Sequence, residues 1–119
     1  MAAPNPQKKA AATRTSRLSE AMEVLQALGF APRQRNEVAG YVLLSLLDLA
    51  ADAPWISSQS PLRGITPMIT FIRESYGVSY APNTRETIRD EAVKYFVEAG
   101  MVLRNPDSPQ RPTNSGNTV

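Results

Sequence analysis

Two helix-like runs separated by a short turn occupy residues 66–100, TPMITFIRESYGVSYAPNTRETIRDEAVKYFVEAG. The first run is expected to be a helix over 67–76, because Thr66 is a good N-cap and Pro67 a good first helical residue. Gly77 ends this helix and opens a six-residue turn. Two helices joined so closely are typical of a helix–turn–helix motif.

The second helix of the motif is expected to begin at Asn83, which with Glu86 approximates a capping box, and to stop at Gly100. Its apolar residues fall within about 100° of one another on a helical wheel. They are Ile88, Ala92, Tyr95, Phe96 and Ala99. This stripe predicts the face that the helix turns toward the core.

Two further helices are predicted upstream of the motif. The first spans about 17–28, where leucine and methionine recur at helical spacing. The second follows Asn36 as its N-cap and spans 37–49. This helix is apolar nearly all round, which is typical of the central helix of a small bundle. A loop rich in proline and serine then covers 50–63, and Trp55 within it is expected to cover the core.

After the helices the pattern changes to a short β-type run at 101–104. Residues 105–112 are rich in turn formers, and the tail to Val119 offers the first residues of a returning strand. We therefore expect a mainly α fold, a helix–turn–helix bundle of about four helices with a short β-wing (winged helix-like). Because the chain stops where the second strand should begin, we also expect a fragment of a longer protein.

The positive charge lies in the flanks of the chain. The formal net charge is +2, but residues 18–100 carry seven Lys or Arg against ten Asp or Glu. We divide the chain into a flexible basic arm, residues 1–16, and a helix–turn–helix domain, residues 17–119. The arm can add non-specific phosphate contacts. Its candidate residues are Lys8, Lys9 and Arg14.

Several functional classes are excluded by composition. The chain has no cysteine and no histidine, which rules out disulfides, Cys/His zinc sites and histidine acid–base chemistry. No apolar run approaches the length of a membrane span, and no secretory signal is present, so we expect a cytoplasmic protein without a membrane partner. Asp48 and Asp52 lie four residues apart but lack a third ligand for a metal. We therefore expect no catalytic, cofactor or metal site in this chain.

The start of the second motif helix carries small polar and basic residues. In helix–turn–helix proteins this region meets base edges in the major groove, and a wing commonly meets the adjacent backbone. The candidate contacts on the helix are Asn83, Thr84, Arg85, Thr87 and Arg89, and those on the wing are Arg104, Arg111 and Asn114. The helix has a net charge of −1, and Arg85 or Arg89 could instead pair with Glu74. The competing interpretation is therefore a bundle that serves as an interaction module.

Five strings of the sequence form a recognisable set. They are RGITPMI (63–69), YAPNTRETIR (80–89), FVEAG (96–100), NPD (105–107) and RPTNS (111–115). Together they resemble the N-terminal helix–turn–helix region of BsuBI/PstI-type restriction endonucleases, over about residues 17–119. One departure stands out, because Asp90 and Glu91 occupy positions where the family often has a basic residue and a glutamine. The departure lowers the positive potential of the helix.

The resemblance implies a type II restriction enzyme that cuts double-stranded DNA with magnesium, at CTGCAG in its best-known members. It also implies a separate C-terminal nuclease domain that this chain lacks, so no catalytic residue carries over. The predicted function is a DNA-binding domain that positions this nuclease domain, with double-stranded DNA and the nuclease domain as partners and a homodimer left open. The alternative is a dimerisation or scaffold module of the same enzyme without DNA contacts.

Overall fold

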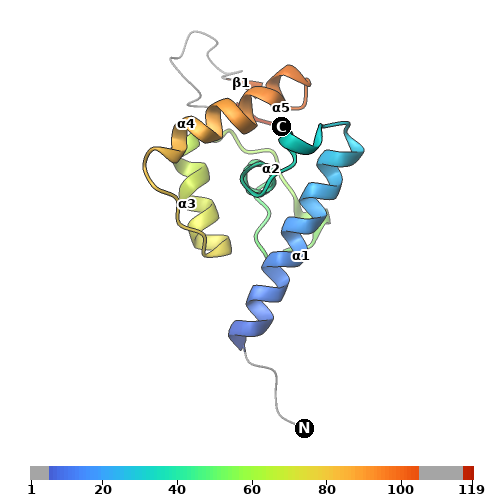
Figure 1. Ribbon diagram of the computed structural model, residues 1–119. Coiled ribbons are helices and arrows are strands. Elements are labelled where there is room, and N and C mark those ends of the chain that lie inside the picture. Colours follow the sequence, from blue (N-terminus) through green and yellow to red (C-terminus); the bar gives the residue numbers. More distant parts are fainter. Residues whose placement is uncertain (1–5, 105–116) are drawn as a thin grey trace.

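The computed structural model describes residues 6–104 and 117–119, with side chains for 16–103 and 118–119 (Figure 1). The elements are α1 (Pro6–Ala27), η1 (Pro32–Gln34), α2 (Glu37–Leu46), η2 (Trp55–Ser57), α3 (Ile65–Tyr76), α4 (Thr84–Ile88), η3 (Arg89–Val93), α5 (Lys94–Glu98), β1 (Leu103–Arg104) and β2 (Asn117–Thr118). The segments α4, η3 and α5 follow one another without a break and form one helical rod. The fold is mainly helical, as the sequence predicts. Within the described residues, no helix is both long and apolar enough to cross a bilayer.

The helix α2 is the centre of the bundle. Figure 1 shows it nearly end-on between α1 and α3, with the α4–α5 rod across one side. Every residue of the range 39–46 is buried. Asn36 caps the helix, because its side-chain oxygen accepts a hydrogen bond from the Ala39 N–H at 2.9 Å. A helix that is apolar on all sides needs neighbours on all sides, so the predicted central position is confirmed.

The helix α1 begins at Pro6, well before the start expected at residue 17. The earlier residues include a run of three alanines and two lysines, which have high intrinsic helix propensity, and proline suits a first helical position. Apolar periodicity predicts a helix start at residue 17 because it detects only the buried part of a helix. It does not detect the helical residues that project from the core. Gly29, at φ 91°, follows the helix in the left-handed conformation, as expected for a helix end. The boundary between arm and domain at residue 16 remains a prediction.

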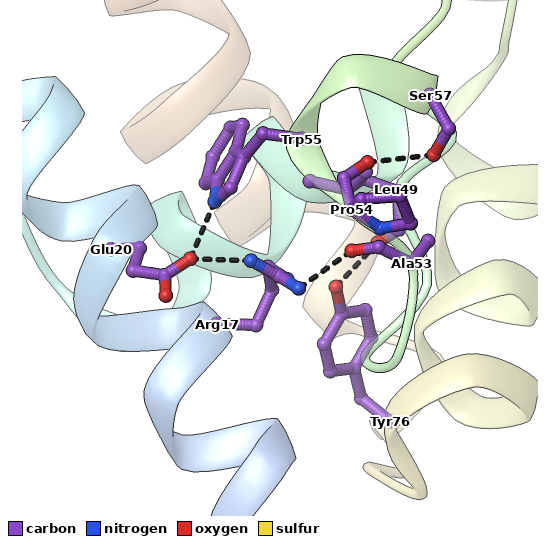
Figure 2. Close-up of polar contacts among 8 residues, drawn as sticks. All are labelled: Arg17, Glu20, Leu49, Ala53, Pro54, Trp55, Ser57 and Tyr76. Atoms are coloured by element: carbon purple, nitrogen blue, oxygen red, sulfur yellow. Dashed lines mark hydrogen bonds and ion pairs between the residues drawn. The ribbon is translucent and has the colours of Figure 1, made fainter.

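The loop after α2 is attached to α1 by a polar cluster around Arg17 (Figure 2). Arg17 Nη1 contacts the Glu20 carboxylate at 2.5 Å, and Arg17 Nη2 donates to the Ala53 carbonyl at 2.6 Å. Trp55 packs against the core, as predicted, and its indole N–H donates to Glu20. The Trp55 hydrogen bond, followed by Arg17, lowers the pKa of the Glu20 carboxyl. The loop is therefore held in place by contacts with residues far away in the sequence.

Both expected caps of the helix–turn–helix segment are wrong. The helix α3 starts at Ile65 behind Gly64, so Thr66 lies in its first turn and makes no cap. Asn83 precedes α4 but has helical angles, φ −72° and ψ −9°, and its side chain makes no capping hydrogen bond. A capping side chain reaches the helix N–H groups from an extended backbone, which Asn83 lacks. The predicted capping box with Glu86 is therefore absent.

The buried face of the α4–α5 rod differs in part from the predicted stripe. Ile88, Ala92 and Phe96 are buried as expected, but Ala99 is exposed and Val93 is buried in its place. The reason is the π-helical turn η3, in which the Lys94 N–H bonds the Arg89 carbonyl five residues back. This wider turn inserts a residue into the helical period, so the face after it is rotated. A wheel drawn at a constant 100° per residue cannot anticipate that shift.

The strands β1 and β2 pair antiparallel, with Leu103 opposite Thr118 and Arg104 opposite Asn117. The Thr118 hydroxyl also donates to the Ser60 carbonyl at 2.9 Å, which attaches the pair to the loop before α3. The two-residue strand β2 lies at the chain end, where the sequence predicts the first residues of a returning strand. This short pair does not by itself show the predicted β-wing. Residues 105–116, where most of the predicted wing falls, lie outside the described residues.

Candidate nucleic-acid interface

The turn between α3 and α4 is held by local hydrogen bonds and by packing. Gly77 ends α3 at φ 71°, and its N–H bonds the Arg73 carbonyl at 2.9 Å. The Thr84 N–H bonds the Ala81 carbonyl at 2.9 Å, which starts α4. Tyr80 packs against the core, and this burial raises the pKa of its phenol to about 12. The turn therefore gives α4 a fixed direction relative to α3.

The first part of the α4–α5 rod presents a polar face opposite its buried residues. Asn83, Arg85, Glu86 and Asp90 are exposed, while Ile88 is fully buried. The side chain of Arg89 is 42% exposed. Thr84 and Thr87 are half-buried at the edges of this face. Residues four apart lie one above the other on a helix, so Arg85 and Arg89 form an adjacent pair of cations. The structure thus brings all five candidate residues of this helix together at its first turns.

The guanidinium of Arg89 is bound to the next residue in the chain. Its Nε donates to Asp90 Oδ1 at 3.0 Å and its Nη2 to Asp90 Oδ2 at 3.4 Å. These hydrogen bonds raise the pKa of Arg89 and lower the pKa of Asp90. Glu74, which the sequence offered as a partner for either arginine, forms no ion pair with a described residue. Within the described part of the chain, Arg85 also forms no ion pair.

The remaining candidates are placed only in part. Arg104 lies in β1, and its side chain is outside the described residues. Arg111 and Asn114 lie outside the described residues altogether. The arm residues Lys8, Lys9 and Arg14 belong to α1, but their side chains also lie outside the described residues.

Asp48, just after the end of α2, has a structural role. Asp48 contacts Arg63 Nη2 at 3.0 Å, and Arg63 Nη1 donates to the Ser45 carbonyl at 2.5 Å. The Arg63 guanidinium also lies over the Phe71 ring, 4.7 Å from its centroid. Asp48 therefore joins the end of α2 to the segment before α3. The described ranges contain no group of three Asp, Glu, His or Cys that could hold a metal ion.

The pairing of Asp90 with Arg89 is the feature of this surface that the sequence does not predict. Its only signal is that Asp90 follows Arg89 directly. Adjacent side chains on an α-helix diverge, so sequence spacing does not predict that they pair. From sequence alone, Asp90 is expected only as a negative charge that opposes DNA binding.

Comparison with known proteins finds similarity to one domain of restriction enzymes. A family model described as "BsuBI/PstI restriction endonuclease HTH domain" matches residues 15–119. The chain is 47% identical over 104 residues to the type II restriction enzyme BsuBI of Bacillus subtilis, covering 87% of the chain and 33% of that enzyme. It is 38% identical over 96 residues to the type II restriction enzyme AplI of Arthrospira platensis, covering 81% of the chain and 29% of that enzyme.

A solved structure is also similar to the chain. The structure of SdaI restriction endonuclease matches with a TM-score of 0.78 and 25% sequence identity, over 85% of this chain and 32% of that one. The chain therefore spans about one third of the length of the relatives that it matches.

Proposed function

The chain belongs to the family of BsuBI/PstI restriction endonuclease helix–turn–helix domains, and we propose on this basis that it is the DNA-binding part of a type II restriction enzyme. The observation that carries the proposal is the polar face at the start of the α4–α5 rod. Two arginines one turn apart stand on a helix whose other side is anchored in the core. A rigid helix that presents arginines to solvent suits entry into the major groove.

Each candidate residue has a proposed role. Arg85 and Arg89 read base edges or bind phosphates, since arginine can do both. Asn83, Thr84 and Thr87 meet backbone or base edges beside them. The wing residues Arg104, Arg111 and Asn114 contact the adjacent backbone, as wings commonly do. The arm residues Lys8, Lys9 and Arg14 add sequence-independent phosphate contacts.

The wider enzyme is part of the same proposal. We infer that a separate nuclease domain, in the two thirds of the relatives that this chain does not cover, cuts the DNA with Mg²⁺ at a site of the CTGCAG class. This chain positions that domain on the duplex. In this proposal the Mg²⁺ and the cleavage step belong to the nuclease domain.

Binding of the 119-residue chain to labelled duplexes with and without CTGCAG, across a salt series, tests the proposal. We expect tighter binding to the duplex that contains the site, and a steep loss of affinity with salt, because phosphate contacts release counterions. Absence of binding at low salt by a folded chain would remove the proposal.

Exposed apolar side chains favour a second candidate function, a dimerisation or scaffold module. Ile56 is 95% exposed, and Leu62 and Leu103 are also exposed. Apolar side chains that gather into one exposed patch mark protein interfaces, and these residues are the ones such a patch would use. Sedimentation of the chain over a concentration series tests this candidate. A tight dimer that does not bind DNA would favour it over the first proposal.

A further inference from the structure

We propose that Asp90 is a positioning residue that aims Arg89 at a guanine, so that the two side chains together form the base-reading element of the α4–α5 rod. The inference rests on the proposed DNA-binding function and names the residue pair that gives it sequence preference. From its charge alone, Asp90 is expected to oppose DNA binding, whereas the inference gives it a role in base recognition.

Asp90 occupies only some of the N–H donors of Arg89. Asp90 accepts from Nε at 3.0 Å and from one N–H of Nη2 at 3.4 Å, so it covers one side of the guanidinium plane. An arginine has five N–H donors. The outer end, formed by Nη1 and the second N–H of Nη2, keeps two parallel donors. Two parallel donors match the O6 and N7 acceptors of guanine in the major groove.

The charge of the pair favours a base over the backbone. The Arg89–Asp90 pair has no net charge, so its attraction for a phosphate is weaker than that of a lone arginine. The guanine edge is neutral and is recognised by hydrogen bonds. An arginine whose charge is compensated but whose outer donors remain is therefore better suited to a base than to the backbone.

Both the backbone and the side chain of Arg89 are restrained. Arg89 is the first residue of η3, and its carbonyl accepts the Lys94 N–H across the π-helical turn. Ala92 and Val93 of the same turn are buried and anchor the backbone beneath it. Asp90 then restricts the long side chain of Arg89 before DNA arrives. Less side-chain freedom is lost on binding, which favours a specific contact.

Arg85 provides the contrast. It lies one turn earlier on the same exposed face, and within the described part of the chain it forms no ion pair. A flexible, uncompensated cation can follow phosphates of any sequence. The two arginines of this face are thus suited to different tasks.

An exposed ion pair between neighbouring residues adds little to folding stability, so stability alone does not account for the arrangement. The Arg89 and Asp90 side chains are 42% and 59% exposed. Substitutions here are therefore expected to leave the fold intact, which circular dichroism of each variant checks.

The test is selection from a duplex library with a randomised central block, with the full 119-residue chain and three variants. The unaltered chain is expected to enrich guanine at one position. Asp90→Asn, which keeps the shape but weakens the pair, and Arg89→Lys, which lacks the fork, are expected to lose roughly 5- to 150-fold of that discrimination. Glu91→Gln is the matched control, because it removes the same charge one residue further on and Glu91 forms no ion pair with a described residue.

The outcomes separate the inference from the proposed function. Loss of guanine preference in Asp90→Asn with Glu91→Gln unchanged, and no loss of affinity for random duplex, supports the positioning role. If Asp90→Asn keeps the guanine preference, or if Glu91→Gln loses it equally, the positioning role of Asp90 is overturned, while the proposed DNA binding stands. Duplex binding by the unaltered chain without any base preference also overturns it. No binding by the unaltered chain at low salt removes the proposed function and this inference together.

Discussion

The indole N–H of Trp55 donates a hydrogen bond to the carboxylate of Glu20, 35 residues earlier in the chain (Figure 2). The same carboxylate accepts from Arg17, whose guanidinium lies 5.7 Å from the centroid of the Trp55 ring. A single acidic side chain on α1 thus joins a cation and an aromatic ring. The contact holds the loop after α2 against α1, and so supports the bundle that carries the α4–α5 rod.

The first prediction concerns this contact. Trp55→Phe keeps an aromatic ring but removes the donor, and we expect it to lower the free energy of unfolding by about 1 kcal/mol, because Glu20 is partly exposed. Chemical denaturation measures the change. In a double-mutant cycle with Glu20→Gln, the double variant should lose less stability than the sum of the two single losses, since both substitutions weaken the same charged hydrogen bond. Fully additive effects would show that the contact contributes nothing.

The second prediction is a pH dependence. The hydrogen bond from Trp55 and the charge of Arg17 lower the pKa of Glu20 from its ordinary value of 4.5 in the folded state. The carboxylate is therefore preferred in the fold, so its contribution to stability is present above 4.5 and is lost as pH falls through the lowered pKa. The urea midpoints of the unaltered chain and Glu20→Gln should differ at pH 7, and this difference should shrink as the pH falls below 4.5 and through the lowered pKa. A constant difference at every pH would contradict this.

The third prediction concerns the contact between α1 and α2. A Cβ on Gly40 would lie 2.6 Å from Leu18 Cδ1 and 3.5 Å from Met22 Cγ. The end of the Leu18 side chain can swing aside for one methyl group, and alanine adds helix propensity, so Gly40→Ala should leave stability nearly unchanged. Gly40→Val is larger and branched, and should cost about 1–3 kcal/mol through overpacking. Thermal unfolding of both variants measures the contrast, and equal midpoints would contradict it.

The fourth prediction concerns Arg85. Arg85→Ala should weaken duplex binding by about 1–3 kcal/mol, and a phosphate contact would also lower the salt slope by about one. Fluorescence anisotropy across a salt series measures both quantities. Arg33→Ala is a matched control, because Arg33 is exposed and lies on η1, outside the helix–turn–helix segment. The role of Arg85 fails if both variants bind like the unaltered chain.

Particular elements show how far local sequence chemistry reaches. Asn36 as an N-cap, the apolar α2 and the glycines that end the helices were all predicted, because each depends on a few neighbouring residues. Thr66 and Asn83 were predicted as caps and are not, since a cap also needs an extended backbone that residue type alone does not impose. The resemblance to the restriction enzyme family was readable from short strings, and the comparisons confirm it.

From the amino-acid order alone came the helical class of the chain, its central helix, its family and the location of the candidate surface at the start of the second motif helix. Those properties follow from periodicity, helix ends and short motifs, which are local. The tertiary structure alone revealed the π-helical turn at Arg89, the pairing of Arg89 with Asp90, and the contact between Glu20 and Trp55. Each of these features depends on how the side chains and the backbone pack in three dimensions, and spacing along the sequence does not specify the distances between the contacting groups.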